Sequence, residues 1–167
     1  MTANDSFDAR QLRSVLGRFF TGVTVVTTVD ESGRPWGVTA NSFTSVSLDP
    51  PLVLWNQALS SVSHPAFAAA ERFTVNILAD DQVPISQRFA RSDDNKFDGV
   101  AVTTGLGGVP FIDGCCAVLE CRKVATHDGG DHVVFIGQVE RLHSNERRPL
   151  LFGDGKYMEA QPLQLAG

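Results

Sequence analysis

A dense set of small polar side chains marks residues 37–51, GVTANSFTSVSLDPP. Six residues with hydroxyl or amide side chains lie within nine positions of this stretch: Thr39, Asn41, Ser42, Thr44, Ser45 and Ser47. Together with backbone N–H groups at a strand end, such side chains can surround a polar ligand that has many hydrogen-bond acceptors. Threonine also suits strands and serine suits turns, so a purely structural strand and turn is the alternative.

A second polar cluster is SSVSHP, from Ser60 to Pro65. Its three serines precede a predicted helix start, where free backbone N–H groups and the helix dipole favour an anion. A phosphate would fit there, and Arg88 in the run QRFA would supply a cation. The alternatives are that Ser63 only caps the helix and that Arg88 is a solvated helix residue.

The histidines at 127 and 132 raise two possibilities, a metal site and a single functional histidine, and the sequence favours the second. His127, Asp128, Asp131 and His132 lie within six residues, but we expect a turn there in which the side chains diverge, and so no metal. His132 begins a predicted strand, where functional groups are common. The motifs GxGxxG, GxxxxGKS/T, GxSxG and HExxH are missing from the sequence, so a Rossmann nucleotide site, a P-loop and a serine hydrolase lack motif support.

Composition narrows the class of protein. The chain has 167 residues, 43% hydrophobic and 20% charged, which predicts one ordinary globular domain. A formal net charge of −5 argues against a nucleic-acid binder, and the sequence lacks an apolar run long enough to span a membrane. The N-terminus does not resemble a signal peptide, so we expect a cytoplasmic protein. The odd number of cysteines, Cys115, Cys116 and Cys121, predicts reduced, buried thiols.

Hydrophobic periodicity predicts helices at about 7–21, 65–71 and 81–90. In the first of these, Asp5 or Ser6 would cap the start and Gly22 would end the helix. Apolar and β-branched runs predict strands at 23–29, 35–43, 52–56, 73–78, 115–124 and 132–142, with a tight turn at 126–131 and a short strand or turn at 150–157.

Strands and helices do not alternate regularly in this order. The pattern favours a mainly β fold, a closed or partly closed antiparallel barrel with peripheral helices. We expect a single domain over residues 1–167, with an N-terminal helix at about 7–21, the barrel at about 23–157 and a short C-terminal tail.

Several motifs together resemble the flavin reductase-like family, over most of the chain from Leu12 to Tyr157 and in the family's order. They are FFTGVTVVTT at 19–28, GRPWGVTANSFTSVSLDPPLV at 33–53, the SS of SSVSHP, FTVNILADDQ at 73–82, RFA at 88–90, GDH at 130–132 with Gly137, and LLFGDGKY at 150–157. The string TANSFTSVSLDPP is the most specific of them.

The resemblance implies a homodimer with the six-stranded antiparallel split β-barrel that binds FMN. Such a protein reduces FMN or FAD with NADH or NADPH, and the reduced flavin then diffuses to a separate flavin-dependent monooxygenase. A flavin ring needs hydrogen-bond partners and positioning more than acid–base catalysis from the protein, which suits the polar stretch.

The resemblance also assigns roles to single residues. Thr39, Ala40, Asn41 and Ser42 would lie along the flavin ring and ribityl chain, with Ser45, Val46, Ser47 and Asn56 close by. Ser60 and Ser61 would hold the phosphate, and Arg88, Phe89 and Ala90 would close over the flavin. His132 would lie near the nicotinamide, and Tyr157 would help to hold NAD.

One departure from the family pattern concerns the phosphate. The run LWNQALSS at 54–61 has no lysine where many relatives carry a basic residue, which leaves the choice between FMN and FAD open. Two other functions are compatible with this fold: an electron carrier with permanently bound FMN, and a non-catalytic split barrel that binds haem, a pyridoxal-type phosphate or a protein partner.

Overall fold

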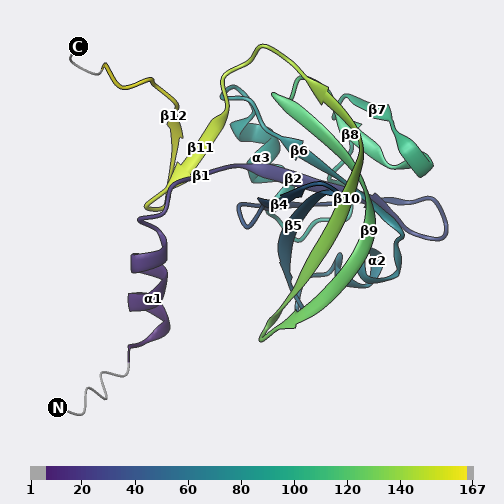
Figure 1. Ribbon diagram of the computed structural model, residues 1–167, viewed down its shortest axis with the longest axis horizontal. Coiled ribbons are helices and arrows are strands. Elements are labelled where there is room, and N and C mark those ends of the chain that lie inside the picture. The colour runs from purple at the N-terminus through teal and green to yellow at the C-terminus, as the bar shows by residue number, and fades with distance from the viewer. Residues whose placement is uncertain (1–6, 165–167) are drawn as a thin grey trace.

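A seven-stranded antiparallel sheet forms the body of the computed structural model, which describes residues 7–164 (Figure 1). Its strands are β2 (Thr24–Val29), β3 (Pro35–Ala40), β4 (Thr44–Leu48), β5 (Pro51–Ala58), β6 (Arg72–Ile77), β9 (Ala117–Gly129) and β10 (His132–Ser144). They lie side by side in the order β3-β2-β6-β9-β10-β5-β4. The sheet curls so far that β3, at one end, also contacts β5, close to the other end.

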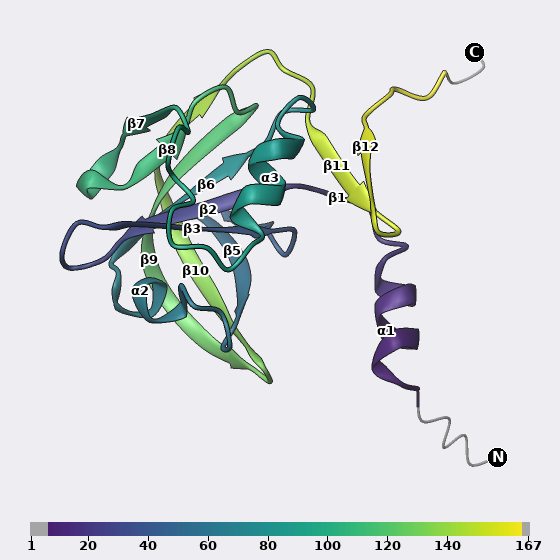
Figure 2. The ribbon, with the colours of Figure 1, turned by 180° about the vertical axis from the view of Figure 1, so that it is seen from behind.

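Two smaller sheets and several short helices complete the described chain. β1 (Thr21–Gly22), β11 (Leu150–Gly153) and β12 (Lys156–Glu159) form one sheet, and β7 (Val102–Thr104) and β8 (Pro110–Ile112) form a hairpin. The helices are α1 (Ala9–Leu16), α2 (His64–Ala69), α3 (Val83–Phe89) and the 3-10 helix η1 (Leu106–Gly108). α3 lies against β2 and β3, as the view from behind shows (Figure 2).

The mainly β, antiparallel architecture predicted from the sequence is confirmed. The six expected strands correspond to β2, β3, β5, β6, β9 and β10, and β4 adds a seventh at the edge because part of the polar stretch pairs with β5. The expected turn at 126–131 is shorter, since β9 continues to Gly129 and only Gly130 and Asp131 turn the chain. Over residues 7–164, no helix has the length and apolar character that crossing a membrane requires.

The first helix is shorter than predicted. α1 starts after Asp8, whose carboxylate accepts a hydrogen bond of 2.7 Å from the Gln11 N–H, and it ends at Gly17 rather than Gly22. The helix cannot continue to Gly22, because Thr21 and Gly22 have an extended backbone and pair with β11. The expected caps Asp5 and Ser6 lie outside the described residues.

Aromatic side chains fill the core that supports β5. Trp55 is fully buried and stacks on Phe135, with ring centroids 5.1 Å apart, and it meets Phe67 and Phe73 edge-on. The inward side chains of β5 alternate with half-buried ones that face the other side, as a strand requires. This packing fixes β5 in the direction perpendicular to the sheet.

The three cysteines are free and buried, as the sequence predicted. Burial raises the pKa of Cys115 to about 12 and that of Cys121 also to about 12, because a thiolate would lose its hydration there. Both therefore remain thiols near neutral pH.

Glu120 is a buried carboxylate on β9. Only 1% of it is exposed, and it accepts hydrogen bonds from the Leu106 N–H at 2.5 Å and from His143 Nε2 at 2.8 Å. Burial favours the protonated form, but these hydrogen bonds and the nearby Arg141 guanidinium outweigh it and hold the pKa of Glu120 below its usual value. The carboxylate thus ties η1 to the main sheet.

The lowered pKa predicts how stability depends on pH. The folded protein binds its proton on Glu120 less tightly than the unfolded chain, so the ionised form stabilises the fold above the ordinary value of 4.5. This contribution is lost as the pH falls through the lowered value in the folded protein. We expect Glu120→Gln to lower the free energy of unfolding by about 2 kcal/mol at about pH 6, and by less at about pH 3.5.

Urea denaturation of both proteins at the two pH values measures this difference. Glu31→Gln, in the exposed turn between β2 and β3, is the matched control and should change little at either pH. A Glu120→Gln penalty that is equally large at both values would show that the charge of Glu120 is not what stabilises the fold.

Candidate functional site

A hollow of about 380 Å³ lies where the end of β3 approaches β5. This volume is in the range of roughly 300–1,000 Å³ that small-molecule sites occupy. The hollow is lined by Val38, Thr39, Ala40, Asn41, Ser42, Trp55, Asn56, Gln57, Ala58, Ser61 and His132. Seven predicted site residues, far apart in sequence, therefore come together here: Thr39, Ala40, Asn41, Ser42, Asn56, Ser61 and His132.

The hydroxyl of Ser42 joins the two walls of the hollow. Its Oγ accepts a hydrogen bond from the Asn56 N–H at 2.9 Å and donates one to the Asn56 carbonyl at 2.9 Å. In the β4–β5 ladder Thr44 faces Leu54, so positions 42 and 56 would form the next pair of the same kind. A side chain thus takes the place of a backbone partner at the end of the ladder, just before the chain enters β4.

Asn56 offers a hydrogen-bond acceptor that nothing in the described chain uses. Its side-chain Oδ1 is buried and has no partner among residues 7–164. A buried acceptor without a partner is costly, so a bound ligand that donates an N–H would remove this cost. The orphaned oxygen lines the hollow and indicates a ligand with a donor group.

A chain of hydrogen bonds supports the β3 wall from behind. Thr39 Oγ1 donates to the carbonyl of Ser86 on α3 at 2.6 Å, and the hydroxyl of Ser86 lies 2.9 Å from that of Tyr157 on β12. Tyr157 also packs edge-on against Phe152, with centroids 5.4 Å apart. Tyr157 does not line the hollow, but it is connected to Thr39 through α3.

Gln57 is a buried residue of the site that the sequence analysis missed. Its Nε2 donates to Ser63 Oγ at 2.9 Å and to Ser61 Oγ at 3.4 Å, and its Oε1 lies 3.2 Å from His64 Nδ1. Ser63 is the residue before α2, but its hydroxyl is not used to cap the helix. The signal in the sequence was a glutamine at an inward-facing position of a strand, where an apolar residue is the rule.

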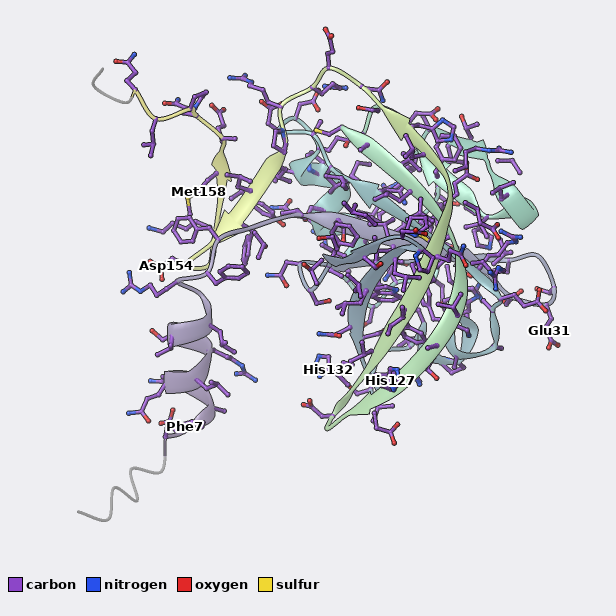
Figure 3. The ribbon with its side chains drawn as sticks, viewed as in Figure 1. Phe7, Glu31, His127, His132, Asp154 and Met158 are labelled. Atoms are coloured by element: carbon purple, nitrogen blue, oxygen red, sulfur yellow. The ribbon has the colours of Figure 1, made fainter. Side chains whose placement is uncertain are left out.

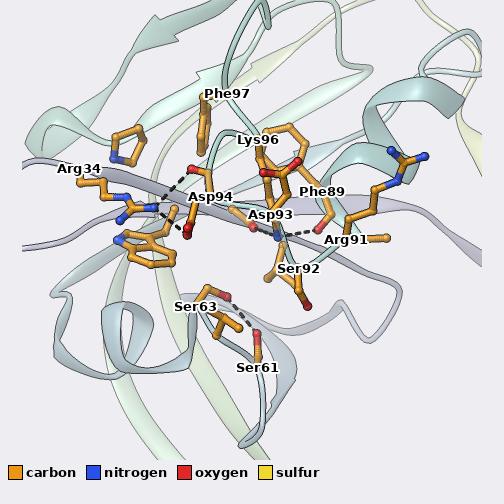
Figure 4. A pocket seen from close by; sticks show the side chains of 16 residues that line it. Arg34, Ser61, Ser63, Phe89, Arg91, Ser92, Asp93, Asp94, Lys96 and Phe97 are labelled. Atoms are coloured by element: carbon orange, nitrogen blue, oxygen red, sulfur yellow. Dashed lines mark hydrogen bonds and ion pairs between the residues drawn. The ribbon is translucent and has the colours of Figure 1, made fainter.

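A smaller pocket of about 90 Å³ adjoins the hollow and shares Val38 and Ser61 with it (Figure 4). The predicted site residues Phe89 and Ala90 line this pocket rather than the hollow. Phe89 is fully buried against Gly37, where a Cβ atom would approach its ring to 2.6 Å. Only glycine at position 37 allows α3 to pack so closely on β3.

The remaining predicted residues are not brought to the hollow. Ser45, Val46 and Ser47 lie on the edge strand β4, with Val46 at a bulge that interrupts the pairing with β5. Ser60 is exposed in the turn before α2. Arg88 is exposed at the end of α3, and its guanidinium donates to the carbonyl of Asp98. The flavin contacts proposed for these residues stay predictions.

His132 stands at the rim of the hollow, at the start of β10 (Figure 3). Its Nδ1 lies 2.7 Å from a carboxylate oxygen of Asp131. The hydrogen bond from His132 lowers the pKa of Asp131, which stays ionised and favours a proton on Nδ1. His127 lies on β9, not in a turn, and residues 7–164 hold no group of three or more His, Cys, Asp or Glu side chains placed to bind a metal.

Comparison with known proteins identifies relatives of this chain. The family model described as "Flavin reductase like domain" matches residues 16–161. The FMN reductase (NADH) SmoA of Agrobacterium fabrum is 47% identical over 150 residues, which are 90% of this chain and 85% of the relative. The reductase subunit HsaB of a flavin-dependent monooxygenase from Rhodococcus jostii is 42% identical and covers 96% of this chain and 82% of its own.

A solved structure of a related oxidoreductase has the same fold as this chain. The NADH:FAD oxidoreductase of Streptomyces globisporus, in complex with NAD and FAD fragments, superposes with a TM-score of 0.88 at 41% identity. The match covers 93% of this chain and 94% of that one.

The double hydrogen bond of Ser42 predicts the effect of removing its hydroxyl. Ser42→Ala leaves the N–H and carbonyl of Asn56 without their partner, so we expect the free energy of unfolding to fall by about 1–3 kcal/mol. Urea denaturation measures this change. Ser45→Ala removes an exposed hydroxyl of β4 and is the matched control. Equal stability of the two variants would show that the Ser42 bridge does not hold the walls together.

Proposed function

The chain belongs to the flavin reductase-like family, and we propose on that basis that it is an NADH:flavin oxidoreductase that supplies reduced flavin to a partner monooxygenase. FMN and FAD are both named for relatives, and NADH is the named donor in the two oxidoreductases compared above. We treat the flavin as a substrate that binds, is reduced and leaves. The cytoplasm is the proposed location, because NADH is produced there.

The unpartnered Oδ1 of Asn56 is the observation that carries this function. A flavin ring has acceptors at N1, O2, O4 and N5 and one donor, the N3–H. Among residues 7–164, Asn56 Oδ1 is a buried acceptor of the hollow without a partner, and it is the group that an N3–H would satisfy. Asn41 and the backbone N–H groups near it are the donors available to the ring acceptors.

The flavin, when bound, supplies the site that accepts a hydride from nicotinamide. The residues of this chain bind the ring, orient it and exclude water from one of its faces. The wall from Thr39 to Ser42 is held at one end by the Ser42 bridge and from behind by Ser86. Rigid walls keep the geometry for hydride transfer without further reorganisation, which is positioning catalysis.

His132 is proposed to position the nicotinamide at the rim of the hollow. The carboxylate of Asp131 favours the tautomer with its proton on Nδ1, and in the neutral imidazole of this tautomer Nε2 is an acceptor. An amide group such as that of nicotinamide has the N–H donors that this nitrogen needs. Tyr157 is proposed to act with it on NAD, and Ser60, Ser61, Phe89 and Ala90 on the phosphate end of the flavin.

The activity assay follows NADH at 340 nm with purified protein and free flavin. We expect NADH consumption that requires added FMN or FAD, and a flavin that separates from the protein on gel filtration. Without flavin-dependent turnover the proposed function fails. A flavin that stays bound through gel filtration and receives electrons from a protein donor would instead indicate an electron carrier.

A histidine pair on the β9–β10 hairpin tests the nicotinamide role. We expect His132→Ala to lower kcat/KM for NADH about tenfold or more, with the Kd of FMN unchanged, because only the nicotinamide contact is lost. His127→Ala on the adjacent strand is the matched control, since His127 is exposed and lies outside the lining of the hollow. Equal kinetics of both variants would remove His132 from the mechanism.

A homodimer is proposed from the first helix. α1 stands away from the main sheet (Figures 1 and 2), and apolar side chains on it and just after it are open to solvent: Val15 and Leu16 of α1 are 69% and 62% exposed, and Phe19 after the helix is 78% exposed. Exposed apolar faces of this kind usually lie in an interface. A second copy of the chain is the proposed partner for this surface.

Light scattering coupled to gel filtration measures the mass in solution. We expect a dimer for the natural chain and a shift towards monomer for Leu16→Asp, which places a charge in the buried interface. Arg10→Asp, on the same helix, adds a carboxylate to the polar face and should leave the mass unchanged. A natural chain that elutes as a monomer would contradict the dimer.

A further inference from the structure

A second cavity, of about 330 Å³, adjoins the hollow at Asn41, which lines both. One of its walls is the end of α1 with the residues that follow, and the other is the turn at 152–155 that joins β11 to β12. Figure 3 shows Asp154 on this turn, beside the helix. The volume suits a small-molecule site, and a ligand that leaves the hollow past Asn41 enters this cavity.

Short contacts fix the two walls of the cavity relative to each other. The Asp154 N–H donates to the carbonyl of Gly17 at 2.8 Å, at the end of α1. Gly153 lies so close to Phe20 that a Cβ atom on it would come within 2.0 Å of the aromatic ring. Asp154 and Gly155 have positive φ angles of 50° and 73°, as a tight two-residue hairpin turn requires. The Asp154 side chain therefore stands on a turn that is bound to the helix.

The lining of the cavity combines three kinds of group. Leu16, Phe19 and Phe152 are apolar and give a planar ring a surface to cover. Arg13 is a cation and Asp154 is a carboxylate, and neither side chain has a hydrogen bond or an ion pair within residues 7–164. An apolar surface, a cation and an unpaired acceptor match the base, the phosphates and the ribose hydroxyls of a nucleotide.

The hydride donor is the nucleotide that can reach this cavity. Its nicotinamide is proposed to lie near His132, at the rim of the hollow, so the rest of the molecule must leave the hollow. The small pocket proposed for the phosphate end of the flavin joins the hollow at Val38 and Ser61, whereas this cavity joins it at Asn41. The two nucleotides thus have separate exits, and the one past Asn41 is left for the adenosine half of NADH.

We infer that Asp154 makes the enzyme select NADH over NADPH, because its carboxylate accepts a hydrogen bond from the 2′-hydroxyl of the adenosine ribose in this cavity. The inference rests on the proposed function, since it takes NADH as the hydride donor. NADPH carries a phosphate at this position, with a charge of about −1.5 to −2 at pH 7, which a carboxylate repels. Arg13 pairs with the diphosphate, which both nucleotides share.

Equilibrium binding of NADH and of NADPH to the protein without flavin, followed by the fluorescence of the reduced nicotinamide, tests the inference without turnover. For the natural chain we expect the Kd of NADPH to be about tenfold or more above that of NADH. In Asp154→Asn this ratio should fall about fivefold or more, because the charge is removed while asparagine tolerates the positive φ of the turn. Asp154→Gly also fits the turn and should give the same result.

Matched variants control for charge and for helix packing. Glu159→Gln removes a carboxylate of β12 outside the lining, so the NADPH-to-NADH ratio should not change. Arg13→Met should raise the Kd of both nucleotides about tenfold and leave their ratio unchanged, because the diphosphate is common to them. Arg10→Met, on the same helix but outside the lining, should change neither Kd.

The outcomes separate this inference from the proposed function. An unchanged ratio in both Asp154 variants overturns the inference and is the result expected if a second copy of the chain fills the cavity. A natural chain that binds both nucleotides equally, or neither of them, also overturns it. A loss of NADPH binding alone in Arg13→Met would place the 2′-phosphate at Arg13 and overturn it as well. Only a failure to oxidise NADH or NADPH with added flavin would contradict the proposed function itself.

Discussion

The bridge from the Ser42 hydroxyl to the backbone of Asn56 is the constraint on which the site depends. Where an antiparallel ladder ends, the backbone N–H and carbonyl groups of the remaining strand need other hydrogen-bond partners. Ser42 supplies them with one oxygen, so the chain can leave β3 and enter β4 at the other end of the sheet while the N–H and carbonyl of Asn56 on β5 keep hydrogen-bond partners. The hollow is the space between the end of β3 and β5. The polar residues before Ser42 then form its second wall.

The site divides into two parts with different chemistry. The hollow offers neutral hydrogen-bonding groups and one unpartnered acceptor, which suit a polar ring. The adjoining pocket offers the half-buried ammonium of Lys96 and serine hydroxyls, which suit an anion. Val38 and Ser61 line both parts, so a ligand with a ring at one end and a phosphate at the other can reach both at once. Gln57 lines the hollow and donates hydrogen bonds to Ser61 and Ser63, so it positions the turn that borders both parts.

The sequence was sufficient to locate the β3 wall, because polar residues alternate with apolar ones there and such density is unusual in a strand. It also predicted most strands, from their apolar and β-branched runs. It did not predict β4, because the same residues also suit a turn. Gln57 was missed, since a buried glutamine on a strand has no local pattern that shows what its side chain contacts. Arg88 was assigned from its position in a motif, and only the fold shows its guanidinium at Asp98.

The proposed function requires the hollow between β3 and β5 to bind the flavin ring. A crystal structure of the protein with FMN tests it most directly. We expect the ring between residues 39–42 and β5, with its N3–H within hydrogen-bond distance of Asn56 Oδ1. A ring bound elsewhere on the surface, with Asn56 Oδ1 still unpartnered or bonded only to water, would contradict it.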